Sequence, residues 1–299
     1  MVKLLIKILI SIGLISILLY KIDIHAFTAM LTRIGPIQFL GLALIYLTSQ
    51  IISSIRWHMI IKSLGEDVST KDLFKLYLMG MFANLFLPSI IGGDGVKAYM
   101  LSKQIGWQKS ISSIFLERYN GLLALLALSL VSLIAFFKLF SIKIAIIVIA
   151  ANIFAIVGIF FLRFFNHPKL KKFYQDIALF HKSDKLITVS ALSVLVQVSV
   201  ILVYILTGKL LGFKVSTAYY FAFIPIITLI SFLPVSFNGI GVREFSFVYF
   251  FKFAHLNSTQ SVSLSVAVFF VVVFCSLLGG VFYLDGRILK EIRSVRKKA

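Results

Sequence analysis

The sequence predicts an all-α integral membrane protein, and two observations carry this prediction. Of the 299 residues, 60% are hydrophobic and only 14% are charged, with a mean hydropathy of +1.02, whereas a soluble domain has roughly 45–50% apolar and about 25% charged residues. In addition, the apolar segments follow one another along the whole chain without a polar block between them. Such a chain cannot cover a water-facing surface, so we expect one polytopic membrane domain over residues 1–299.

Apolar runs of about 20 residues cross a bilayer as helices. The full transmembrane helices that we predict, about six in all, lie at 4–20, 37–61, 110–137, 142–162, 186–206 and 262–284. The first run resembles a signal peptide, because Lys3 and Lys7 precede its apolar residues, but it has no small-residue cleavage site. We therefore interpret it as a retained membrane anchor.

Two further apolar stretches, at 72–100 and 217–253, are interrupted by proline, glycine and charged residues. The segment LFLPSIIGGDGVKAY (85–99) aligns without a gap on SFLPVSFNGIGVREF (231–245), with a proline, two glycines and a base in the same register. This match predicts an internal repeat. We expect each stretch to form a broken re-entrant hairpin, and the three spans between them would make the second copy inverted relative to the first.

The distribution of Lys and Arg favours hairpins over single crossings. If the N-terminus is inside, two hairpins place most bases on the inner side, whereas two single crossings would put the basic loop 163–185 outside, against the positive-inside rule. We therefore predict a multi-pass protein of the cytoplasmic membrane with both termini cytoplasmic. The 163–185 loop itself leaves two alternatives: an amphipathic helix on the inner leaflet surface, suggested by apolar residues near helical spacing, or a plain connection.

The acidic residues expected in or near the membrane interior are each accompanied by a base. These pairs are Asp94 with Lys97, Glu117 with Arg118, and Glu244 with Arg243. Ionisable groups in hydrocarbon are costly unless paired or hydrated, so they are candidate functional residues, and the alternative is an ion pair that only holds a hairpin in place. Because adjacent helical residues point about 100° apart, Glu117 and Arg118 should reach different partners, such as the first hairpin.

The glycine-rich breaks at 92–95 and 238–241 are each followed by a base. Glycine allows positive φ and a close approach of backbone N–H groups to a ligand. A helix N-terminus with a neighbouring base would suit a lipid phosphate. The alternative is a helix-breaking turn without a ligand.

Several other functions are disfavoured by the sequence. Neither break fits a nucleotide-binding motif, the histidines lack zinc-type spacing, and paired catalytic carboxylates are absent, so we assign no catalytic residue, metal or cofactor. Cys275 is the single cysteine, which excludes a disulfide within the chain. The net charge of +19 lies in short loops suited to anionic lipid rather than nucleic acid. The Arg56-Trp57 pair is typical of an interfacial anchor.

Several motifs in order carry a family resemblance: RW near the end of the second span, N-x-F-x-P-x-x-x-G-G-D-G-V-K-x-Y, E-R, and P-x-S-x-N-G-I-G-V-R-E. Over roughly residues 5–285, the chain resembles the lysylphosphatidylglycerol synthase transmembrane family, also called the flippase-like domain family. In the full-length synthases this region is thought to move the aminoacylated lipid between leaflets, and a soluble C-terminal domain attaches the amino acid. We expect this chain to be a stand-alone member without that domain.

The resemblance and the charge pattern together define the candidate substrate-binding residues. They are Asn84, Gly92, Gly93, Asp94, Lys97, Glu117, Arg118, Asn238, Gly239, Arg243 and Glu244. We expect the two hairpins to meet at mid-membrane, so that Lys97, Arg118 and Arg243 attract a phosphate-bearing headgroup.

The predicted function is translocation of an anionic or phosphate-bearing membrane lipid, or a lipid-linked precursor, between leaflets. One alternative is a membrane-embedded transferase on a lipid-linked substrate, with Asp94 or Glu117 as its base, which a metal requirement would favour. The other is a non-catalytic scaffold for a separate lipid-synthesis enzyme, which a co-purifying partner would favour.

Overall fold

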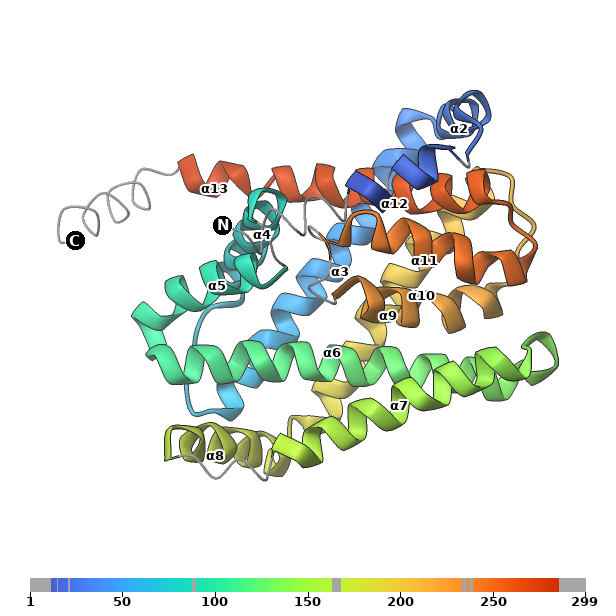
Figure 1. Cartoon of the computed structure of the whole chain (residues 1–299). Coiled ribbons are helices and arrows are strands. Elements are labelled where there is room, and N and C mark those ends of the chain that lie inside the picture. Colours follow the sequence, from blue (N-terminus) through green and yellow to red (C-terminus); the bar gives the residue numbers. More distant parts are fainter. Residues whose placement is uncertain are drawn as a thin grey trace.

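The regular structure of the protein is helical in every part of the chain that the computed structural model describes, namely residues 12–14, 16–20, 22–87, 90–162, 168–232, 236 and 239–284 (Figure 1). In chain order the helices are α2 (Ile24–Leu31), α3 (Pro36–Ser63), α4 (Thr70–Phe86), α5 (Ile90–Ile105), α6 (Trp107–Ala135), α7 (Ile142–Leu162), α8 (Pro168–Lys182), α9 (Leu186–Leu210), α10 (Thr217–Phe232), α11 (Val242–Phe251), α12 (Ser258–Leu277) and α13 (Gly280–Leu284). The composition-based prediction of an all-α protein is therefore confirmed for these residues.

Four of the helical segments are long and apolar enough to cross a membrane. They are α3, α6, α9 and the continuous segment Ser258–Tyr283 formed by α12 and α13, which confirms the predicted spans 37–61, 110–137, 186–206 and 262–284. A fifth candidate joins Ile12–Tyr20 to α2 across a bend of 98°.

The remaining two predicted spans are only partly supported. The predicted span 142–162 forms α7, in which Ile142–Phe154 counts as a shorter apolar helix. The predicted span 4–20 lies largely outside the described residues. The described chain thus contains four or five candidate spans, together with shorter apolar helices, where about six were predicted.

The first broken stretch folds as an antiparallel pair of helices, α4 and α5. The amide oxygen of Asn84, near the end of α4, accepts a hydrogen bond of 2.7 Å from the N–H of Gly93, near the start of α5. Tyr77 lies about two turns before Asn84 on α4, and Lys97 lies about one turn after Gly93 on α5. The Tyr77 ring is 4.5 Å from the Lys97 ammonium. Earlier positions on one helix face later positions on the other, so the chain reverses between them.

Gly92 and Gly93 lie inside α5 and have no positive φ, so the prediction that they break the helix is wrong. Helix α4 ends at Phe86 and α5 begins at Ile90, and the predicted break at Pro88 lies outside the described residues. Gly93 instead allows α4 and α5 to approach closely, because a Cβ there would stand 2.1 Å from the backbone oxygen of Gly80. A helix can contain glycine when close packing against a neighbour requires it.

The second broken stretch folds as the antiparallel pair α10 and α11. The Tyr220 ring, near the start of α10, lies 5.3 Å from that of Phe251, at the end of α11. Here the glycines do interrupt the helix, because Gly239 and Gly241 have φ of 75° and 84°, values that favour glycine. The predicted break is therefore confirmed at these two residues, while Pro234 and Asn238 lie outside the described residues.

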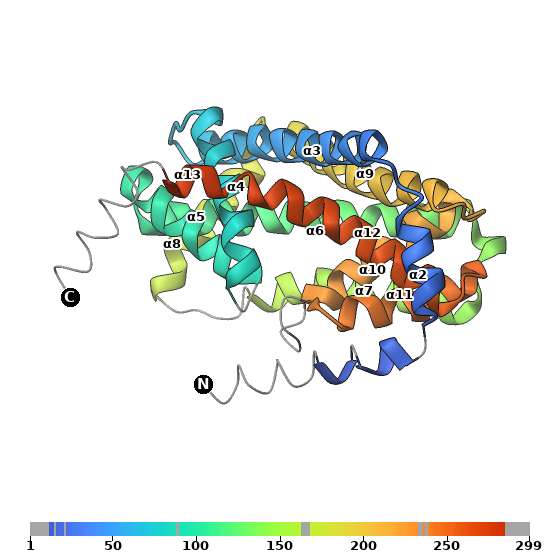
Figure 2. The same cartoon turned by 90° about the horizontal axis from the view of Figure 1, so that it is seen from above.

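The two helix pairs adjoin opposite ends of α6. The pair α4–α5 leads directly into the N-terminus of α6 at Trp107, whereas the start of α10 meets its C-terminal part, where the Ser132 hydroxyl donates a hydrogen bond of 2.9 Å to the Ala218 carbonyl. Figure 1 shows the same placement, and Figure 2 shows α3 and α9 packed side by side. The Arg33 guanidinium, just before α3, donates to the Leu211 carbonyl at the end of α9, so α3 and α9 are antiparallel.

The amphipathic-helix alternative for the 163–185 loop is confirmed over α8. Phe180 is fully buried, whereas Lys171, Lys172 and Lys182 are exposed. The buried Asp176 carboxylate accepts hydrogen bonds from Ser112 at 2.6 Å and from Gln108 at 3.2 Å, both on α6. These contacts hold α8 against the first turns of α6.

Candidate functional site

Helices α3, α5 and α6 bring five charged side chains together inside the protein. Arg56 comes from α3, Asp94 and Lys97 from α5, and Glu117 and Arg118 from α6. We call these five residues the ion cluster. Helices α4 and α9 add polar groups to its edge, so five helices build it.

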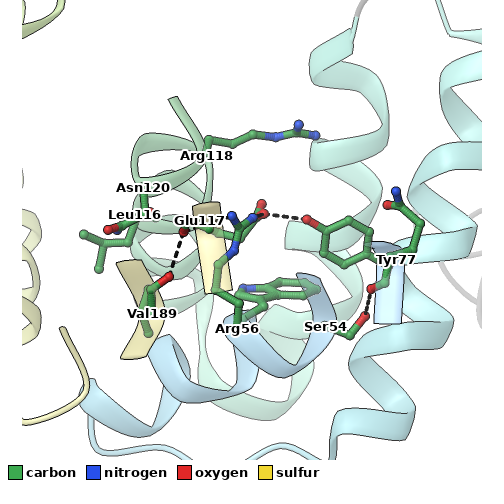
Figure 3. Close-up of polar contacts among 12 residues, drawn as sticks. Ser54, Arg56, Tyr77, Leu116, Glu117, Arg118, Asn120 and Val189 are labelled. Atoms are coloured by element: carbon green, nitrogen blue, oxygen red, sulfur yellow. Dashed lines mark hydrogen bonds and ion pairs between the residues drawn. The ribbon is translucent and has the colours of Figure 1, made fainter. Parts of the chain in front are cut away.

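Glu117 is the centre of the ion cluster. Its carboxylate forms an ion pair with Arg56 and accepts a hydrogen bond of 2.5 Å from the Tyr77 hydroxyl (Figure 3). The Lys97 ammonium is 3.9 Å from the second carboxylate oxygen, Oε2, which has no hydrogen-bond partner in the described part of the chain. A buried carboxylate is stable only with such partners, so Glu117 depends on three other helices.

Arg56 is buried, and so is Trp57, so the interpretation of this pair as an interfacial anchor is wrong. The α3 helix continues past this pair to Ser63, so the pair does not lie at the end of the helix. Arg56 also donates to the Ser193 hydroxyl of α9 at 3.1 Å, and the Trp57 indole N–H donates to Ser113 of α6 at 3.2 Å. A buried arginine requires a carboxylate, which only the tertiary fold supplies here.

Arg118 pairs with Asp94 rather than with its neighbour Glu117, as the helical geometry predicted. Its guanidinium binds both carboxylate oxygens of Asp94, with Nε to Oδ2 at 2.9 Å and Nη2 to Oδ1 at 2.8 Å. The Lys97 ammonium shares Oδ1 at 2.9 Å. Figure 3 shows the Arg118 side chain separate from the contact between Glu117 and Tyr77.

The ion cluster has an excess of positive charge. Arg56, Lys97 and Arg118 face only two carboxylates, those of Asp94 and Glu117, when all five groups are ionised. The Lys97 ammonium is further stabilised by the rings of Trp57 and Tyr77, whose centroids lie 5.1 and 4.5 Å away. A net positive site of low exposure is suited to an anionic group.

The Arg243–Glu244 pair of the second hairpin is neutral and separate. Glu244 accepts hydrogen bonds from the Arg243 Nε at 2.8 Å, the Ser265 hydroxyl at 3.0 Å and the Gly241 N–H at 2.8 Å. The Arg243 guanidinium lies 4.4 Å from the Phe269 ring. Among the described residues Arg243 forms its hydrogen bonds with Glu244 and Ser265, so it does not join Lys97 and Arg118 as expected.

The other predicted site residues that the structure describes take part in helix packing or in a turn. Asn84 and Gly93 bond to each other between α4 and α5, and Gly92 packs against Leu87. Gly239 forms the positive-φ turn, and Asn238 lies outside the described residues. Among the described residues no three His, Cys, Asp or Glu side chains are grouped to hold a metal ion.

Tyr77 and Ser193 are not among the site residues that the sequence predicts, although both contact the ion cluster. A tyrosine or serine in an apolar helix carries no distinctive local signal. Arg56 belongs to the family motif, but its position near the end of a predicted span favours an interfacial anchor over a buried site residue.

Comparisons with known proteins give the family and two relatives. Residues 4–279 match the family model described as the lysylphosphatidylglycerol synthase TM region. UPF0104 membrane protein MJ1078 of Methanocaldococcus jannaschii is 26% identical over 238 residues, which cover 71% of this chain and 97% of that protein. UPF0104 membrane protein MJ1595 of the same organism is 42% identical over 71 residues, 23% of this chain and 21% of that protein. No solved structure matches the chain.

Proposed function

Because the chain belongs to the lysylphosphatidylglycerol synthase transmembrane-region family and is a multi-pass membrane protein, we propose that it moves a phosphate-bearing lipid or lipid-linked precursor between leaflets. The observation that carries the proposal is the ion cluster, a buried site with more cations than carboxylates. Charged residues at membrane depth are costly and usually functional.

The depth of the ion cluster supports this role. Glu117 lies ten residues from Trp107, the first residue of α6, so at 1.5 Å per residue it is about 15 Å from that end of the helix. The whole of α6 has 29 residues, about 43 Å at this rise, so an α6 centred on a hydrocarbon core of roughly 30 Å would place Glu117 inside the core rather than at its boundary. A headgroup that reaches the cluster would have left the interface and entered the membrane interior.

The two hairpins supply a route for alternating access. In this proposal α4–α5 and α10–α11 are re-entrant hairpins of an inverted repeat, entering the membrane from opposite sides. Inverted repeats with broken helices are typical of transporters, in which one half rocks against the other around a central site. Rocking of the two halves would open the ion cluster to one leaflet and then to the other.

The distribution of exposed lysines supports an orientation. The exposed Lys62, Lys71, Lys75 and Lys103 lie at the end of the molecule where α3 ends and α6 begins. The lysines of α8 add to this end. Under the positive-inside rule it faces the cytoplasm, with both termini on that side.

A leaflet-accessibility assay tests the proposal. The purified protein is reconstituted in liposomes with fluorescent phosphatidylglycerol or phosphatidylethanolamine, and an impermeant quencher reports the outer-leaflet fraction over time. We expect exchange with the wild-type protein and at least a tenfold lower rate with Glu117→Gln and Arg118→Gln. Lys252→Gln, which changes an exposed base outside the ion cluster, is the matched control. The absence of exchange for every tracer under every imposed gradient would contradict the proposal.

A further inference from the structure

The ion cluster has a closed half and an open half. Glu117, Arg56 and Lys97 are each at most 3% exposed in their side chains, whereas Asp94 is 18% exposed and Arg118 is 42% exposed. A ligand that arrives from outside therefore meets the Asp94–Arg118 contact first. The closed half is held by contacts from Tyr77 and Ser193.

The Asp94 carboxylate is bound as a phosphate would be bound. It receives two parallel hydrogen bonds from the Arg118 guanidinium and a third contact, at 2.9 Å, from the Lys97 ammonium. A forked arginine contact supplemented by a lysine is a common arrangement around phosphate oxygens. A headgroup phosphate and the Asp94 carboxylate would thus compete for the same donors.

Asp94 lies next to open space on α5. It follows Gly93 in α5, and the next residue, Gly95, is exposed and has no atom within 4 Å of the place where a Cβ would stand. The exposed side of α5 next to Asp94 is therefore open, and Asp94 itself is 18% exposed. Glu117 has no comparable freedom, since it is buried beneath Tyr77 and Arg56.

We infer that Asp94 is a resident counter-ion, which an incoming phosphate displaces from Arg118 and Lys97 and which returns when the phosphate leaves. The identity of the phosphate as that of a lipid rests on the proposed function. Displacement lets the ligand neutralise the excess positive charge of the ion cluster. The return of Asp94 restores the empty site and limits the affinity, so the ligand can be released.

A tryptophan adjoining the ion cluster provides a direct readout. The chain contains two tryptophans, Trp57 and Trp107, and the Trp57 ring lies 5.1 Å from the Lys97 ammonium. In a Trp107→Phe background, Trp57 is the sole tryptophan, and its fluorescence reports binding to the detergent-solubilised protein. The probes are short-chain phosphatidylglycerol, phosphatidylcholine and inorganic phosphate.

The decisive comparison is Asp94→Asn against Asp72→Asn. Asp72 forms the same type of pair three residues before a lysine, with 3.3 Å between the Lys75 ammonium and Asp72 Oδ1, but on an exposed surface. We expect Asp94→Asn to bind the anionic probe about tenfold more tightly, while Asp72→Asn leaves binding unchanged. Equal or weaker binding in Asp94→Asn would show that Asp94 only stabilises the fold, and would overturn the inference.

Gly95 offers a second variant that leaves every existing contact of the ion cluster in place. Gly95→Asp adds a negative charge on the exposed face of α5, one residue after Asp94, and Gly95→Asn is its neutral control. We expect Gly95→Asp to bind the anion about tenfold more weakly than Gly95→Asn. Equal binding by the two Gly95 variants would count against an anion site at this position, even if Asp94→Asn failed to fold.

The probes separate this inference from the proposed function. Tighter binding of phosphatidylglycerol by Asp94→Asn, combined with wild-type exchange in liposomes, supports both. Tighter binding of inorganic phosphate alone supports the counter-ion role but identifies the ligand as a free anion, which contradicts lipid transport. Lipid exchange together with weakened binding in Asp94→Asn supports transport and refutes the counter-ion role.

Discussion

The two hairpins align residue by residue in sequence but differ in what they do with the aligned positions. In the first, Lys97 joins a buried cluster with excess positive charge, whereas in the second the aligned Arg243 is neutralised by the adjacent Glu244. The aligned glycines differ as well: Gly93 permits close helix packing, and Gly239 permits a positive φ. A repeated motif therefore preserves the chain reversal but not the chemistry.

The difference originates outside the hairpins. The first hairpin packs on α3 and on the N-terminal part of α6, which bring Arg56, Glu117 and Arg118, whereas the second packs on the serine-rich α12 and on the C-terminal part of α6. Only the first hairpin thus acquires additional charges. The proposed anion site therefore involves the first hairpin, and the second hairpin provides a matched internal reference.

The largest expected contrast is between Glu117→Gln and Glu244→Gln. Loss of Glu117 leaves Arg56 and Lys97 buried without their central counter-charge, so we expect about 3–5 kcal/mol of destabilisation. The Arg243–Glu244 pair is partly exposed, so we expect about 1–3 kcal/mol there. Chemical unfolding in detergent measures both. Equal losses would show that the two hairpins depend on charge to the same extent.

The glycines provide the next contrast. Gly93→Ala would place a methyl group 2.1 Å from the Gly80 carbonyl and force α4 and α5 apart, at a cost of about 3 kcal/mol. Gly239→Ala should cost roughly 1–2 kcal/mol through its positive φ. Thermal unfolding of both variants tests the order, and Gly95→Ala, in open space on α5, should be neutral or stabilising. An unchanged stability of Gly93→Ala would contradict the close approach.

A smaller effect is expected from Tyr77→Phe. This change removes the hydroxyl that donates to Glu117 but keeps the ring beside Lys97, so we expect a loss of about 2 kcal/mol. Tyr204→Phe is the reference near the second hairpin, where the Tyr204 ring stacks on Phe247 at 5.5 Å, and it should change stability by less than about 0.5 kcal/mol. Indistinguishable variants would mean that the Tyr77 hydroxyl contributes nothing to the ion cluster.

The smallest effect concerns the start of the first hairpin. The Ser69 hydroxyl, which donates to the Asp72 carboxylate at 2.8 Å, and then the Lys75 ammonium hold the pKa of Asp72 below its usual range. A lowered pKa in the folded state stabilises the protein at neutral pH and ceases to do so as the pH falls through that value. Ser69→Ala also removes the cap of α4, so we expect a loss of about 1 kcal/mol at pH 7 and a smaller loss at pH 3. Melting temperatures at the two pH values measure this difference, and a loss that grows on acidification would contradict it.

Local sequence determined the class of the protein and most of its helices. Apolar runs of membrane length predicted four spans that the structure confirms, and the aligned proline and glycine residues predicted two chain reversals. The helical offset between adjacent residues predicted that Glu117 and Arg118 would reach different partners. These inferences succeed because hydropathy and helical periodicity depend on neighbours in the chain.

Only the tertiary structure decided which charges meet. Arg56 and Glu117 are 61 positions apart, and Tyr77 and Ser193 carry no local sign that they border the same site. The fold likewise separated Arg243 from the ion cluster and changed the role of Gly93 from a turn to a packing contact. The sequence predicts for each charge an approximate depth in the membrane. The pairing of buried charges depends on which helices pack together, and that is a property of the whole fold.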